Sequence, residues 1–93
     1  MGEKARAHAV IRGRVQGVFF RMETQRAAEA FNVSGWVRNN RDGTVEAVFE
    51  GEKPDVEAML SWCEKGAPRS RVDHVDVSRE AYSGTYSEFS IRH

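Results

Sequence analysis

The fold of this chain is decided between residues 7 and 31, which read AHAVIRGRVQGVFFRMETQRAAEAF. Small or apolar residues at Ala7, Ala9 and Ile11 alternate with His8, Val10 and Arg12, a period of two that predicts a β-strand over residues 7–11. From Phe20 to Phe31 the apolar positions recur at helical spacing, with polar residues on the remaining faces, which predicts an amphipathic helix. A loop with two glycines joins these segments, so the sequence predicts a strand, a turn and a helix in immediate succession.

The loop, residues 13–21, has the composition of an anion-binding site. It leads into a helix N-terminus, where unpaired backbone N–H groups and the helix dipole favour a negative charge. Gly13 and Gly17 allow the backbone to approach a ligand closely or to adopt a positive φ. Arg21 falls in the first helical turn beside the apolar stripe, and its guanidinium adds a permanent positive charge and a bidentate fork. We therefore expect this loop to bind a phosphate group.

The middle of the chain predicts a hairpin and a second helix. Residues 33–39 and 44–50 have strand character, and the Asp42-Gly43 turn between them makes the two strands antiparallel. The second helix is expected to begin near Pro54 and to stop at Gly66. Its apolar residues at i, i+3, i+4 and i+7 are Val56, Met59, Leu60 and Cys63.

The end of the chain adds a strand near residues 72–78 and a short closing strand at residues 89–92. The resulting order is βαββαβ with a closing strand. Two helices with one apolar stripe each can cover one face of a mostly antiparallel sheet. The predicted fold is therefore α+β, a ferredoxin-like two-layer sandwich. A chain of 93 residues has room for one core, so residues 1–93 are expected to form a single domain.

Composition limits the partners of the protein. The formal net charge is zero, from 14 basic and 14 acidic residues that are interspersed, so nothing in the overall balance attracts nucleic acid or an anionic membrane. The single cysteine, Cys63, excludes an internal disulfide, and its place on the apolar stripe predicts a small buried side chain rather than a nucleophile. There is no secretory h-region and no apolar run of the ~20 residues that a spanning helix needs. We expect a soluble, cytoplasmic and monomeric protein.

Several phosphate-handling chemistries are absent from the sequence. It contains no Gly-Lys-Ser/Thr for a nucleotide with magnesium, no Cys-x5-Arg loop, and no clustered carboxylates or histidines for a metal. His8, His74 and His93 lack ligand spacing, so none is assigned a role and no metal or cofactor is expected. Binding must then depend on backbone amides and arginine. Such a site suits an acyl phosphate, whose weakly basic carboxylate leaves without a general acid.

Two blocks of the sequence resemble the motifs of the acylphosphatase family. The first is Gly13-Arg14-Val15-Gln16-Gly17-Val18-Phe19-Phe20-Arg21, and the second comprises Gly35-Trp36-Val37-Arg38-Asn39 with Gly43, Val45 and Gly51. The ending Phe89-Ser90-Ile91-Arg92 is similar to the last strand of the family. The resemblance covers almost the whole chain and implies the same ferredoxin-like architecture.

The resemblance also implies an enzyme that hydrolyses acyl phosphates to carboxylate and inorganic phosphate without a cofactor. Arg21 is expected to anchor the phosphate, and Asn39 to orient the attacking water. Backbone donors are expected from Gln16, Gly17, Val18, Phe19 and Phe20. The last residue is His93 where relatives often have an aromatic residue, a departure expected to leave the chemistry unaffected. Inorganic phosphate is expected as product and competitive inhibitor.

Two other functions are compatible with this fold. One is a regulatory module that binds an acyl phosphate or phosphate without turning it over. The other is an RNA-binding module that stacks bases on Phe19, Phe20 and Trp36 beside neighbouring arginines. The octapeptide typical of that RNA-binding class is absent, and a net charge of zero weakens attraction to a polyanion.

Overall fold

The computed structural model describes residues 2–17 and 19–93 and has the predicted order of elements. Along the chain these are β1 (Lys4–Arg14), α1 (Phe20–Ala30), β2 (Ser34–Asn39), β3 (Val45–Glu52), α2 (Lys53–Lys65), β4 (Arg71–Glu80) and β5 (Phe89–Arg92). The strand predicted over residues 7–11 is longer than expected. Because it pairs with a neighbour on both sides, β3 and β4, it is hydrogen-bonded over most of its length.

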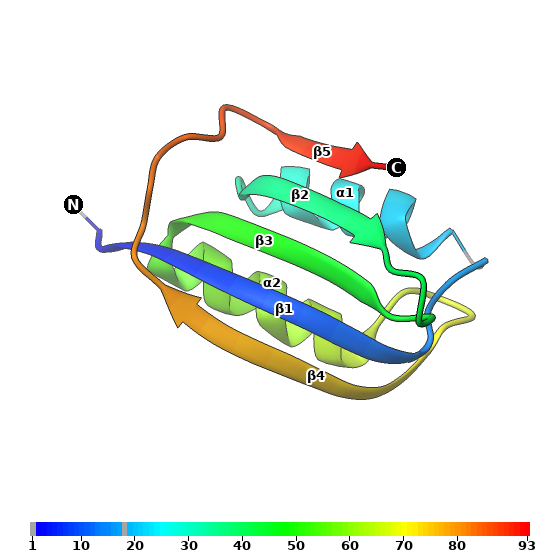
Figure 1. Ribbon diagram of the computed structural model, residues 1–93. Coiled ribbons are helices and arrows are strands. Elements are labelled where there is room, and N and C mark those ends of the chain that lie inside the picture. The colour runs from blue at the N-terminus through cyan, green and yellow to red at the C-terminus, as the bar shows by residue number, and fades with distance from the viewer. Residues whose placement is uncertain (1, 18) are drawn as a thin grey trace.

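Over the described residues the strands form one sheet in the order β4-β1-β3-β2-β5. The pairs formed by β1 with β3, β1 with β4 and β2 with β3 are antiparallel, whereas β5 runs parallel to its neighbour β2. Figure 1 shows both helices on the same face of this sheet. The predicted α+β ferredoxin-like sandwich is therefore confirmed.

The core lies between the helices and the sheet. Both helical stripes predicted from the sequence point inward, and Cys63 is fully buried among them. Burial raises the pKa of the Cys63 thiol to about 12, so the side chain behaves as a small apolar group, as predicted. The sheet contributes alternate residues of its two central strands, namely Ala7, Ala9, Ile11, Val45, Ala47 and Phe49.

The ends of α2 follow the predicted signals. Pro54 stands in the first turn, where a missing N–H costs nothing. Gly66 ends the helix with φ +83°, and its amide donates to the Trp62 carbonyl at 2.7 Å. Both boundaries are confirmed.

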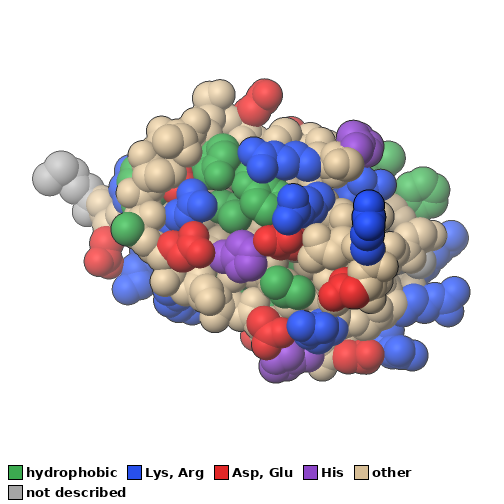
Figure 2. All heavy atoms as spheres, in the orientation of Figure 1, with side chains coloured by type: hydrophobic (Ala, Val, Ile, Leu, Met, Phe, Trp, Pro, Cys, Tyr) green, Lys and Arg blue, Asp and Glu red, His purple; other side chains and the backbone are tan. Residues whose placement is uncertain are grey.

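The sheet face opposite the helices carries side chains of both charges, gathered around a small apolar patch (Figure 2). Glu50 of β3 lies on this face and is fully buried, because the segment that joins β4 to β5 covers it. Its carboxylate accepts hydrogen bonds from the Arg6 guanidinium at 2.9 Å, the Ser83 amide at 3.0 Å and the Gly84 amide at 3.1 Å. These bonds fasten the connecting segment to the sheet and so fix where β5 begins.

Candidate active site

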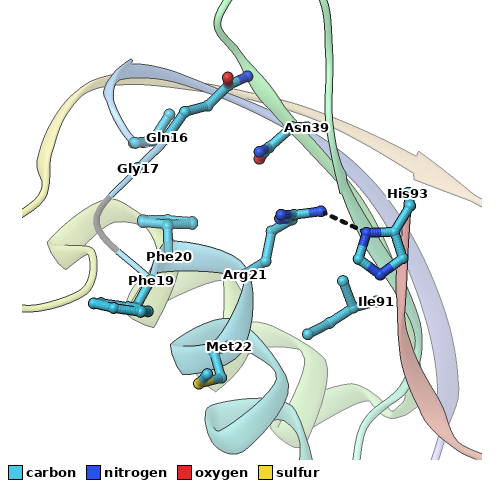
Figure 3. Close-up of a pocket in the computed structure, with 10 residues that line it drawn as sticks. Gln16, Gly17, Phe19, Phe20, Arg21, Met22, Asn39, Ile91 and His93 are labelled. Carbon is cyan, nitrogen blue, oxygen red and sulfur yellow. Dashed lines mark hydrogen bonds between the residues drawn. The ribbon is translucent and has the colours of Figure 1, made fainter.

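A pocket of about 390 Å3 opens where α1 begins and where β2 and β5 end. The loop after β1 supplies one wall and the first turn of α1 another (Figure 3). Asn39 at the end of β2 and His93 after β5 complete it. Residues far apart in the sequence thus meet around the predicted phosphate loop.

The two glycines of the loop have different reasons to be there. Gly17 has φ +75°, and a Cβ added to it would have no atom of the described residues beyond its chain neighbours within 4 Å, so its backbone conformation alone requires glycine. Gly13 has φ +135°, and a Cβ there would lie 2.1 Å from the Arg71 carbonyl oxygen of β4. The close approach predicted at Gly13 is therefore made to a neighbouring strand rather than to a ligand, because β1 continues through Gly13 at an irregularity in its pairing with β4.

The loop ends in an unusual residue, Phe19, which directly precedes α1. Its backbone is left-handed, with φ 59° and ψ 25°, and no side chain of the described residues caps the helix at this position. The first N–H groups of a helix have no intrahelical acceptor, and here they adjoin the pocket with Phe19, Phe20 and Arg21 lining it. Val18, also predicted as a backbone donor, lies outside the described residues.

Arg21 extends from the first turn of α1 into the pocket (Figure 3). Its Nη1 donates to the Arg92 carbonyl oxygen at 3.4 Å and lies 3.5 Å from His93 Nδ1. Contacts of this length are weak, and a guanidinium has five N–H donors. The side chain is therefore oriented by the end of β5 while retaining donors for an anion.

The sequence assigns no role to His93, and the structure places this residue at the site. The imidazole lines the pocket beside Arg21. Gln25 of α1 donates to the Phe89 carbonyl at 3.2 Å, which holds β5 against α1 and so brings the end of the chain to the site. No local sequence pattern predicts this contact, because it joins residues 72 positions apart.

The structure distinguishes Asn39 from its neighbour Asn40. The Asn40 side chain donates to Thr44 Oγ1 at 3.0 Å, and the Asn40 backbone N–H donates to the Thr44 carbonyl oxygen at 2.8 Å. These two hydrogen bonds close the turn between β2 and β3. Asn39 lines the pocket instead, and its exposed side chain makes no hydrogen bond to any described residue. Of the two asparagines, Asn39 is the one whose amide is available to a ligand.

The sequence predicts only a backbone contact for Gln16, but its side chain also forms hydrogen bonds in the structure. The side-chain Nε2 donates to the carbonyl oxygens of Asn40 and Thr44, both at 2.8 Å. These bonds tie the phosphate loop to the turn after β2, so the positions of the loop and of Asn39 are coupled.

The aromatic residues considered for RNA stacking do not share a surface. Phe20 is buried in the core against Trp62. Trp36 is on the other sheet face, 8% exposed and covered by the guanidinium groups of Arg38 and Arg92. Among the described residues no three His, Cys, Asp or Glu side chains are grouped so that they could hold a metal ion, and neither described helix is long and apolar enough to cross a membrane.

Fold and site together define a class of protein, a small α+β sandwich with a glycine-containing loop at a helix N-terminus and an arginine and an asparagine beside it. The sequence model of the acylphosphatase family matches residues 7–91. The chain belongs to the acylphosphatase family, a family of enzymes.

Known relatives agree with this assignment. An acylphosphatase of Anaeromyxobacter sp. is 50% identical over 93 residues, which cover 100% of each chain. The crystal structure of acylphosphatase from Bacillus subtilis has a TM-score of 0.92 at 31% identity and covers 96% of this chain and 99% of that one. An acylphosphatase structure from Coxiella burnetii has a TM-score of 0.90 at 34% identity, and the match covers 96% of this chain and 93% of that one.

Proposed function

We propose that this protein hydrolyses the carboxyl-phosphate bond of acyl phosphates, with Arg21 and Asn39 as its catalytic residues. The observation that supports this most strongly is that both side chains line one pocket with the predicted phosphate loop. Arg21 and Asn39 come from different elements, α1 and β2.

In this mechanism the phosphate group binds at the start of α1. Backbone N–H groups of Gln16, Gly17, Val18, Phe19 and Phe20 donate to its oxygens. The Arg21 guanidinium neutralises the charge that spreads over the equatorial oxygens in the transition state, where preorganised donors have the largest effect.

Asn39 orients the attacking water. A carboxamide donates one hydrogen bond and accepts another without titrating, so it can hold water in line with the leaving group. The water oxygen forms a bond to phosphorus as the bond from phosphorus to the acyl oxygen breaks. The electron pair leaves with the carboxylate, and the water protons end on phosphate or solvent. No general acid is needed because the carboxylate is weakly basic.

The test is hydrolysis of benzoyl phosphate, with chelator present, by the wild type and three variants. We expect Arg21→Gln and Asn39→Ala to lower kcat about 100-fold or more, the usual effect of removing a transition-state donor. Asn40→Ala is the matched control, because it removes an amide from the adjacent residue that closes the turn. It should lower stability by about 1 kcal/mol and retain most of the turnover. Full activity in Asn39→Ala would contradict the proposed role.

The alternative, a regulatory module that binds phosphate without turnover, is distinguished by the same experiment. We expect inorganic phosphate to compete with substrate, since loop and arginine recognise the phosphate rather than the acyl group. An inactive wild type that still binds phosphate would favour the regulatory module, and non-competitive inhibition would contradict a shared site.

We further propose that residues 1–93 act as one cytoplasmic, monomeric domain. The expectation of a cytoplasmic location rests on the lack of a secretory h-region in the sequence. The β4 edge of the sheet is rich in charged side chains, Arg71, Asp73, His74, Asp76, Arg79 and Glu80, which disfavour pairing with a second sheet. Size-exclusion chromatography with light scattering should therefore give the mass of a single chain.

A further inference from the structure

The mouth of the pocket is more apolar than phosphate binding requires. Phe19 is 69% exposed and Met22 is 43% exposed, and both line the pocket. Among the described residues the other exposed large apolar side chains are Val77 on β4 and Tyr82 after it. Single exposed apolar residues need no explanation, but here Phe19 and Met22 share one cavity with Ile91.

Packing does not explain why residue 19 is a phenylalanine. Its left-handed backbone, with φ 59°, is unfavourable for a bulky residue and would suit Gly or Asn better. Its side chain is also largely outside the core. Backbone strain of this kind is found at ligand sites, where it serves the arrangement of groups. An exposed aromatic ring held there is suited to contact a ligand.

The geometry of the proposed reaction indicates which part of the substrate the Phe19 ring would contact. Figure 3 shows Gln16 and Asn39 on one side of the Arg21 guanidinium and Phe19, Met22 and Ile91 on the other. If Asn39 orients the attacking water, in-line displacement directs the leaving carboxylate away from Asn39. The acyl group then lies toward the apolar side chains. A pocket of about 390 Å3 leaves room for such a group beside the phosphate, since ligand sites begin at roughly 300 Å3.

We propose that Phe19, Met22 and Ile91 form an acyl subsite that favours substrates with an aromatic or large apolar acyl group over acetyl phosphate. This inference rests on the proposed function and specifies its substrate class. None of the three side chains carries an N–H or O–H donor, so a polar acyl group would lose water there without compensation. The flexible thioether of Met22 suits contact with an aromatic ring.

The test compares kcat/KM for benzoyl phosphate and acetyl phosphate, each corrected for its uncatalysed hydrolysis rate. Two variants reduce the subsite, Met22→Ser and Phe19→Asn, the latter because Asn tolerates the left-handed backbone. Val77→Ser is the matched control, since it removes a similarly exposed apolar side chain from β4. The inhibition constant of inorganic phosphate reports whether the phosphate loop is intact.

We expect the wild type to favour benzoyl phosphate and the benzoyl-to-acetyl ratio to fall about tenfold in each subsite variant, as for lost apolar contacts in a specificity pocket. The loss should appear in KM more than in kcat, while Val77→Ser keeps the wild-type ratio. A wild type that hydrolyses both substrates with a ratio unchanged by either variant would overturn the subsite and leave the proposed function standing. A wild type that hydrolyses neither would instead overturn the proposed function.

Discussion

At the scale of single residues, adjacent positions in this protein serve different purposes. Asn40 closes a turn through its side chain and Asn39 faces the pocket. Gly17 is needed for its backbone angle, whereas Gly13 is needed for its distance to β4. Residue type alone does not separate these cases, since each pair consists of the same amino acid.

Gly35 gives a prediction at this scale. Its φ is +134°, and a Cβ would lie 1.9 Å from the Val48 carbonyl oxygen of the paired strand β3. Because backbone atoms cannot move aside without breaking the ladder, we expect Gly35→Ala to lower the free energy of unfolding by about 3 kcal/mol. Urea unfolding followed by circular dichroism measures this change.

The control for the stability loss in Gly35→Ala is the variant Gly43→Ala. Gly43 also has a positive φ, +91°, but no atom lies within 4 Å of the added Cβ. Only the backbone penalty applies, about 1 kcal/mol. Equal losses in the two variants would show that the contact with Val48 is not the cause.

At the scale of elements, the segment between β4 and β5 connects stability to the site. It crosses from one edge of the sheet to the other (Figure 1) and is held by the buried Glu50 carboxylate. The same segment leads into β5, whose end contacts Arg21. Burial by itself would raise the pKa of Glu50, but hydrogen bonds from Ser83, Arg6 and Gly84 outweigh burial and hold the pKa below its usual range.

We expect Glu50→Gln to lower the free energy of unfolding at pH 7 by about 3 kcal/mol. The substitution removes the buried negative charge that pairs with the Arg6 guanidinium. The folded pKa of Glu50 is depressed, so its stabilising effect is present above the unfolded value of about 4.3 and is lost as pH falls through the folded value. Glu50→Gln should therefore lose less stability than the wild type between about pH 5 and 3. Urea midpoints measured across this range test the difference.

Asp73→Asn is the control for Glu50. Asp73 pairs with Arg71 at 3.0 Å, but both side chains are more than half exposed, at 54% and 72%. Exposed pairs contribute about 0.5 kcal/mol. If Glu50→Gln lowers the free energy of unfolding no more than Asp73→Asn does, the anchoring role of Glu50 is contradicted.

At the scale of the whole molecule, a chain of zero net charge gathers the groups proposed to bind phosphate in one pocket. The proposed catalytic groups, a guanidinium and a carboxamide, do not change protonation near neutrality. We therefore expect kcat for benzoyl phosphate to vary less than about twofold between about pH 5 and 8 once substrate ionisation is taken into account. Steady-state kinetics across this range provide the measurement.

His93 requires a control in that experiment, because its imidazole lies 3.5 Å from the Arg21 guanidinium. The same profile should be recorded for His93→Phe. A pH dependence that disappears in His93→Phe would trace it to the His93 side chain. A bell-shaped kcat profile that remains would contradict a mechanism without acid–base catalysis.

Much of this architecture could be predicted from the sequence. Hydrophobic periodicity placed α1 from Phe20 and the inward stripe of α2, and turn residues placed the hairpin and the end of α2 at Gly66. Strand boundaries were less accurate: the segment predicted over residues 7–11 extends from Lys4 to Arg14, because partners on both sides, not local propensity, decide where pairing stops.

Local sequence patterns predict the order of elements and the loop at the start of α1, and the resemblance to a family selects Arg21 and Asn39 as the expected catalytic residues. These depend on residues close together in the chain, whose spacing reports secondary structure directly. Three features follow from the folded chain and not from any local pattern: the Gln16 side chain binds the turn after β2, His93 reaches Arg21, and Glu50 is buried. Such contacts join distant segments, and they form only when the order of strands in the sheet brings those segments together.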